Sequence, residues 1–114
     1  MNHDAHTLRE FDAALTSLNT YLLQMAYKAQ SALDLAVAGL LQQDEDPANQ
    51  AIADDEELDE LEMAVDREGM HLLAFFSPVA SDLRVVLASI RLSAIYERMG
   101  DESVTIAKRA NKLN

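Results

Sequence analysis

The sequence of 114 residues has no cysteine and no tryptophan, and it has only two prolines and three glycines. Without cysteine the chain forms no disulfide and no thiolate metal site, which disfavours zinc. No apolar run approaches the ~20 residues of a membrane-spanning helix, and the polar, acidic start lacks the basic-then-apolar order of a secretory signal. From these absences we expect a cytoplasmic chain.

Basic residues are also scarce. Nine lysines and arginines stand against twenty acids, so the formal net charge is -11. Such a charge argues against a surface for nucleic acid or anionic membranes and favours cationic partners. Twelve of the acids lie within residues 44–68, together with a single base, Arg67. A hydrophobic content of 49% and a charged content of 25% are ordinary for one folded domain, here residues 1–114.

Apolar residues recur at alternating spacings of three and four, and strand signals are absent. The first such line predicts one long helix over about 7–43: Leu8, Phe11, Leu15, Leu18, Leu22, Met25, Ala29, Ala32, Ala36 and Leu40. Asp44 as N-cap with Pro47 at the first helical position predicts a second helix over 47–76, and Ser77 with Pro78 predicts a third over 78–113. Because short connections make neighbouring helices antiparallel, we expect an all-α, up-down-up three-helix bundle.

The predicted third helix is apolar on two opposite sides. One stripe also carries two acids: Leu83, Leu87, Ile90, Ala94, Glu97, Asp101 and Val104. The other stripe lies about 180° away: Val85, Ala88, Leu92, Ile95, Met99 and Ile106. Since one core covers one side, we expect the second stripe to meet a second subunit in a homodimer. The alternative is broad burial of both stripes between the first two helices.

Glu97 and Asp101 are one helical turn apart within an apolar stripe. Two such carboxylates repel each other and lose hydration, so we expect a cation between them. Asp55 and Asp59 repeat the spacing in an acidic ladder that continues with Glu62 and Asp66. Oxygen-only ligands suit hard cations such as iron, manganese, magnesium or calcium. For the first pair the rival is a salt bridge to Arg98 or to a base from a neighbouring helix. For the second pair a solvated acidic face is an equal alternative, because the pair lies about 90° from the apolar line of its helix.

Four short segments carry a family resemblance: residues 55–62 (DEELDELE), 77–84 (SPVASDLR), 97–101 (ERMGD) and 106–107 (IA). In order and separation they resemble the PhoU family of phosphate-signalling proteins. The family's metal motif has the form Glu/Asp-x-x-x-Asp, so the resemblance implies metal ligation by Asp55, Asp59, Glu97 and Asp101, with iron, manganese or magnesium as the ion. It also implies a regulatory adaptor that couples a phosphate transporter to a sensor histidine kinase. We expect no enzymatic activity, because the residues offer no activated nucleophile and no acid-base pair beyond the predicted ligands.

The chain departs from the family pattern in two respects. Relatives usually carry two tandem copies of the three-helix unit where this chain has one, and they often have leucine at the position of Tyr96. Either the chain dimerises to restore the doubled arrangement, or it is a module of a longer protein, such as a sodium-phosphate cotransporter. Two other functions compete: a dimeric helical-bundle enzyme with a metal pair, and a plain dimerisation module whose acids are surface charge.

Overall fold

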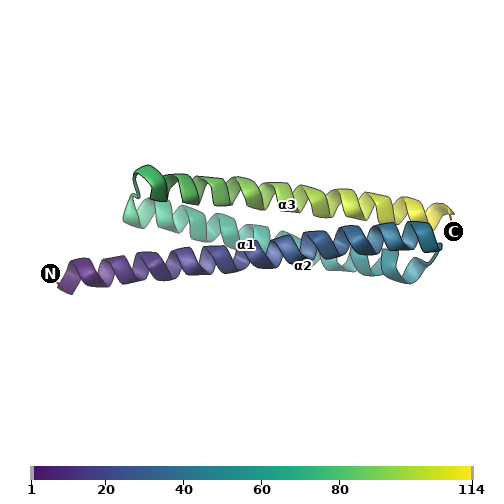
Figure 1. Ribbon diagram of the computed structural model, residues 1–114, viewed down its shortest axis with the longest axis horizontal. Helices are drawn as coiled ribbons and strands as arrows, with labels where there is room; N and C mark the ends of the chain where they lie inside the picture. Colours follow the sequence, from purple (N-terminus) through teal and green to yellow (C-terminus); the bar gives the residue numbers. More distant parts are fainter. Residues whose placement is uncertain (1, 114) are drawn as a thin grey trace.

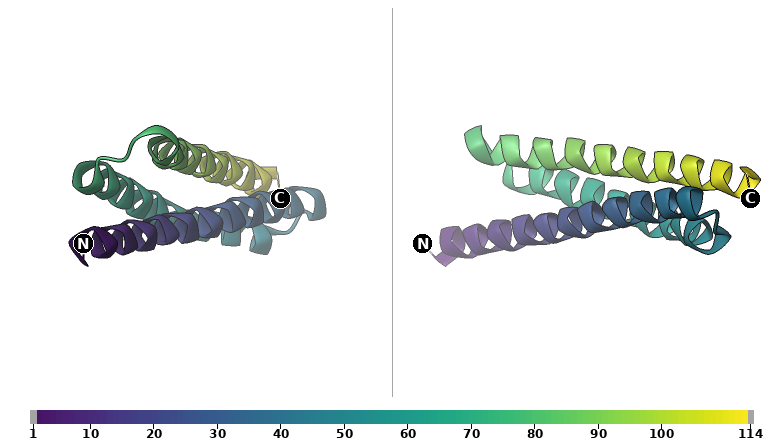
Figure 2. Two further views of the ribbon diagram at one scale, coloured as in Figure 1. Left: turned by 60° about the vertical axis from the view of Figure 1, so that its left-hand side comes forward. Right: turned by 45° about the vertical axis from the view of Figure 1, so that its right-hand side comes forward.

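The computed structural model describes residues 2–113 and consists of three helices, α1 (Asn2–Gln42), α2 (Glu45–Phe76) and α3 (Ala80–Leu113) (Figure 1). α1 and α3 run in the same direction and α2 runs against them, and each helix packs on the other two (Figures 1 and 2). The rod measures 65 × 19 × 16 Å. Residues 2–113 contain no strand, so the predicted all-α, up-down-up bundle is confirmed. None of the three helices is long and apolar enough to cross a membrane.

The connection between α1 and α2 is formed by the residues that the sequence suggested. Asp44 caps α2, because its side chain accepts a hydrogen bond from the backbone N of Asp46 at 3.0 Å. The backbone N of Asp44 in turn donates to the carbonyl of Gly39 at 3.2 Å. α2 begins at Glu45, so Pro47 is its third residue rather than its first. The proline still lies in the first turn, where no intrahelical partner is lost.

The connection between α2 and α3 differs more from the prediction. Ser77 does not cap α3 but ends α2 in the left-handed conformation, with φ 43° and ψ 55°. α3 begins at Ala80, two residues later than predicted, and Pro78 belongs to the connection. Ala80 also has a positive φ of 53°. Two non-glycine residues at this connection therefore hold a backbone conformation that side chains disfavour.

The core follows the heptad line of α1. Its members from Phe11 to Ala36 are buried or half-buried, whereas Leu8 and Leu40 are 63% and 39% exposed because they lie near the ends of the bundle. Large side chains fill most of the core: Phe11, Leu18, Leu22, Met25, Leu58, Val65, Leu72 and Val86. Toward the α1–α2 connection they give way to alanines: Ala36, Ala48, Ala51 and Ala107. The helices can approach closely there because alanine adds little bulk.

The inner face of α3 is not the stripe that we expected. Its buried residues, apart from Val86, are small: Ser89, Ser93, Gly100, Ser103, Ala107 and Ala110. This line lies between the two apolar stripes, so both stripes flank it, and Leu87, Ala94 and Asp101 of the first stripe are exposed. The hydroxyls of Ser89 and Ser103 hydrogen bond to backbone carbonyls four residues earlier. The small residues of this line let α3 pack closely on α1 and α2, and the hydroxyls of Ser89 and Ser103 are satisfied within the helix.

The second stripe of α3 is divided between core and surface. Met99 packs partly against the larger core cluster and Ile106 against the alanine cluster. Val85, Leu92 and Ile95 are 46%, 37% and 54% exposed. The expected dimer surface is therefore limited to the first half of α3, and Met99 and Ile106 contribute less to it than we predicted.

Candidate metal centre

An acidic cluster, which consists of Asp55, Asp59 and Asp101, lies between α2 and α3. One carboxylate oxygen from each residue lies within 4.8 Å of those of the other two. Asp55 and Asp59 are one turn apart on α2 and therefore share a side of that helix, and Asp101 comes from α3. The structure thus brings together three of the four predicted ligands. Both residues of the α2 motif take part, and Asp101 represents the α3 motif.

Gly100 explains how α2 comes so close to Asp101. The glycine is buried, and a Cβ added to it would clash with the side chain of Leu58, which is 1% exposed, and lie 3.1 Å from Oδ1 of Asp55. The absence of a side chain at position 100 therefore sets the separation of the two helices at the cluster. The group that packs against Gly100 is the side chain of Leu58.

Glu97, the fourth predicted ligand, adjoins the cluster through Asp101. Burial, a side-chain hydrogen bond with Asp101 and the charges of Asp101, Glu62 and Asp59 raise the pKa of Glu97 from 4.5 to about 7. Near neutral pH, the carboxyl group of Glu97 therefore holds a proton for part of the time. A bound cation would favour the ionised form and displace this proton.

Two more carboxyl groups lie in the same negative field. Burial, followed by the charges of Asp59 and Asp101, raises the pKa of Asp55, while Lys108 acts in the opposite direction. Burial and the charges of Asp66, Asp59 and Asp101 raise the pKa of Glu62. Glu62 belongs to the acidic ladder of α2, but sequence reasoning did not assign it to the site. The sequence feature that could have assigned Glu62 to the site is its position three residues after Asp59, which puts both residues on the same side of the helix.

The donor set fits a hard cation. Oδ1 of Asp55 is buried and has no hydrogen-bond partner among residues 2–113, although a buried carboxylate oxygen ordinarily has one. The ion pairs within the described part of the chain are His6–Glu10 and Lys28–Glu57, and none involves the four predicted ligands. Arg98, the rival to a metal, is exposed and forms no such pair there. The cluster thus concentrates negative charge, and no lysine, arginine or histidine of the described residues forms an ion pair with the predicted ligands.

Comparison with known proteins gives the cluster a context. Residues 22–110, which include every residue of the cluster, match the PhoU domain family model. The chain belongs to the PhoU family. This confirms the resemblance seen in the four sequence segments, and it places both Glu/Asp-x-x-x-Asp motifs inside the PhoU domain.

Several curated PhoU relatives are similar to most of the chain. A protein of Zymomonas mobilis is 35% identical over 104 residues, which are 91% of this chain and 44% of the relative. One of Xylella fastidiosa is 34% identical over 113 residues, 99% of this chain and 47% of the relative. Both are named phosphate-specific transport system accessory protein PhoU homolog. The chain therefore spans a little under half the length of these relatives.

Proposed function

We propose that this chain is a metal-binding regulatory adaptor in phosphate signalling and the control of phosphate transport. Membership of the PhoU family supports this function, as does the name of its relatives, which describes accessory proteins of a phosphate-specific transport system. In this proposal the chain acts in the cytoplasm by binding a phosphate transporter and a sensor histidine kinase. It catalyses no reaction of its own and works as a homodimer.

The acidic cluster carries the metal part of the proposal. Three carboxylates whose oxygens lie within 4.8 Å of one another repel strongly unless a cation or protons neutralise them. Asp55, Asp59 and Asp101 would hold the ion, with Glu97 beside it. Oxygen ligands favour iron, manganese or magnesium over softer metals. The ion supplies positive charge between α2 and α3, and it thereby orders the face of the bundle that partners contact.

The test is metal binding by protein purified without an affinity tag and treated with a chelator. Calorimetric titration with manganese and with ferric citrate measures affinity, and elemental analysis of the untreated protein identifies the ion. The Glu97→Gln/Asp101→Asn variant should lose at least tenfold in affinity, because it removes charge from one side of the site. Asp54→Asn is the matched control, since Asp54 is next to Asp55 but accepts a hydrogen bond from Gln50 at 2.7 Å.

The outcomes separate the metal from its rival. Equal binding heats for the wild type and the double variant, with both proteins folded, would exclude this site. If a salt bridge neutralises the acids instead, the double variant should lose stability in the absence of metal, since a base would be left without its partner. If the cluster binds metal, the same variant should gain stability without metal, because a repulsive carboxylate pair has been removed.

The enzyme alternative predicts a different observation. A bound metal pair would need an activated nucleophile or a positioned acid and base to turn over a substrate. We expect no phosphatase, peroxidase or ferroxidase activity from metal-loaded protein. Turnover of roughly 1 per second or more, the ordinary enzymatic order, would favour the enzyme over the adaptor.

A further inference from the structure

We propose that the contact between Gly100 and Leu58 makes the acidic cluster selective for small divalent ions, such as manganese and magnesium, over calcium. The inference rests on the metal binding proposed above and names the residues that position its ligands. This contact, called here the glycine contact, joins α3 to α2 beside the cluster. Neither residue has a ligand atom in its side chain, so their role is to fix the distance between the carboxylates that do.

The glycine contact lies among the predicted ligands of both helices. Leu58 stands between Asp55 and Asp59 in the sequence, three residues after the first and one before the second. Gly100 directly precedes Asp101. Any change in the separation of α2 and α3 at this contact therefore changes the distances between the two carboxylates of α2 and that of Asp101.

A methyl group at position 100 would force the two helices apart. Its carbon and Cδ2 of Leu58 would be roughly 1 Å closer than the 3.4–4 Å of an ordinary contact. Leu58 has little room to turn away, because it is 1% exposed and among the largest fully buried side chains. The methyl group would also lie 3.1 Å from Oδ1 of Asp55, so it would press on a ligand oxygen directly.

The difference in size between the competing ions is as large as this displacement. Oxygen ligands lie about 2.0–2.1 Å from magnesium and about 2.3–2.6 Å from calcium. Two ligands on opposite sides of one ion are therefore roughly 0.4 to 1.2 Å farther apart around calcium. Short aspartate side chains on rigid helices compensate poorly for a shift of that size. A widening of the cluster by one methyl group thus favours calcium over the smaller ions.

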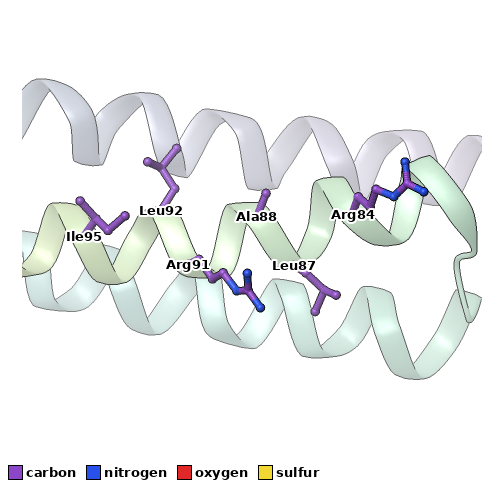
Figure 3. Close-up of a pocket in the computed structure, with 6 residues that line it drawn as sticks. All are labelled: Arg84, Leu87, Ala88, Arg91, Leu92 and Ile95. Atoms are coloured by element: carbon purple, nitrogen blue, oxygen red, sulfur yellow. The ribbon is translucent and has the colours of Figure 1, made fainter.

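The groove on the exposed side of α3 does not compete for the ion. Figure 3 shows the residues that line it, all of which precede Glu97 in the sequence: Arg84, Leu87, Ala88, Arg91, Leu92 and Ile95. The charged residues among them are arginines, which repel a cation. Within residues 2–113 the carboxylates close enough to share one ion are those of the acidic cluster. Ion binding in solution therefore reports on the cluster.

Gly69 offers a matched control, because it forms a second contact of the same kind between α2 and α3. A Cβ at position 69 would lie 2.8 Å from Cδ1 and 2.9 Å from Cγ1 of Ile90. Gly69 is ten residues beyond Asp59 on α2, which is about 15 Å along the helix. Gly69→Ala should therefore disturb the packing of the same two helices without changing the ion preference of the cluster.

The test is the ratio of the manganese affinity to the calcium affinity, measured by calorimetric titration of chelator-treated protein. Gly100→Ala should weaken manganese binding about tenfold and calcium binding less than about threefold, so the ratio falls by at least about threefold. Gly69→Ala should leave the ratio within about twofold of the wild type.

A second substitution at the glycine contact should reverse the effect. Valine at position 58 lacks the atom that meets the new methyl group, and Cγ of Leu58 lies at an ordinary 3.6 Å from that position. Leu58→Val/Gly100→Ala should therefore return the ratio to within about twofold of the wild type, whereas Leu58→Val alone should leave it unchanged. Circular dichroism of every variant verifies that the helices have formed.

Urea unfolding in the presence of each ion gives a second measure that stays usable if Gly100→Ala is unstable. An ion that binds the folded state stabilises it according to its affinity and concentration. At equal concentrations, manganese should therefore raise the urea midpoint of the wild type more than calcium does. This excess should shrink in Gly100→Ala and persist in Gly69→Ala.

The outcomes distinguish this inference from the metal site on which it rests. A wild type that binds neither ion would overturn both. A wild type that binds manganese, together with a Gly100→Ala variant whose ratio is unchanged, would retain the site and overturn the selectivity. An equal fall of the ratio in Gly69→Ala, or a double variant that does not recover, would also overturn the role of the glycine contact.

Discussion

Glu97 makes the stability of the metal-free protein depend on pH, and the sign of this dependence is opposite to that of most surface carboxylates. The pKa of Glu97 rises from 4.5 to about 7 in the folded chain. Between these two values the folded state binds more protons than the unfolded state, so the free energy of unfolding falls as the pH rises. The raised pKa values of Asp55 and Glu62 act in the same direction. Removal of metal should therefore leave a protein that is less stable at pH 8 than at pH 5.5.

The magnitude follows from the size of the shift. A displacement from 4.5 to about 7 corresponds to at most about 3 kcal/mol over the whole titration. Glu97 is only half-buried, and solvent screening reduces such an effect by a factor of two or more. Part of the titration also lies below pH 5.5. We therefore expect the free energy of unfolding to fall by about 1 kcal/mol from pH 5.5 to pH 8.

Urea unfolding followed by circular dichroism measures this change. The range begins at pH 5.5 in order to stay above the sequence pI of about 4.4, near which solubility is low. In the presence of a chelator, Glu97→Gln should remove most of the decrease, because glutamine does not titrate. Glu60→Gln, which changes an exposed carboxylate on α2, is the control and should retain it.

Two results would refute the reasoning. The first is a metal-free wild type whose stability does not fall between pH 5.5 and pH 8. The second is an equal fall in the wild type and in Glu97→Gln, which would assign the effect to other groups. Addition of manganese provides a further check, because a cation that binds the ionised carboxylates should make the wild type more stable as the pH rises.

Three further predictions concern stability and are measured by urea unfolding. Ser93→Ala should raise the free energy of unfolding by about 1 kcal/mol, because the Ser93 hydroxyl is buried without a hydrogen-bond partner; a loss of stability would show that the hydroxyl is satisfied in solution. Ala80→Gly should raise the free energy of unfolding by about 0.5 kcal/mol, because glycine adopts a positive φ more readily. The control Ala94→Gly, in the interior of α3, should lower it by about 1 kcal/mol. Gly100→Ala should lower the free energy of unfolding by about 1 to 2 kcal/mol, because the new methyl group clashes with Leu58. This loss should outweigh the better helix propensity of alanine. An unchanged free energy of unfolding would mean that α2 moves away freely.

The sequence by itself determined the secondary structure and the course of the chain, because both depend on interactions between near neighbours. The heptad line of α1 predicted one long helix and the residues that it buries, and Asp44 predicted the start of α2. Short connections then leave an up-down-up bundle as the compact arrangement. The two acidic motifs were also visible, because i, i+4 spacing places their carboxylates on one side of each helix.

Only the tertiary structure decided how α3 is rotated and which acids meet. Side-chain hydrophobicity suggested that an apolar stripe faces the core, but close packing favoured the line of Ser89, Ser93, Gly100 and Ser103 between the two stripes. That rotation leaves Leu92 and Ile95 partly exposed and places Asp101 at the edge of α2. For Asp55 and Asp59 the sequence left a metal site and a solvated face as equal alternatives. In the structure they reach Asp101 because Gly100 lets Leu58 pack where a side chain would otherwise stand. Both outcomes depend on the shapes of surfaces that are distant in sequence, and no local pattern specifies these shapes.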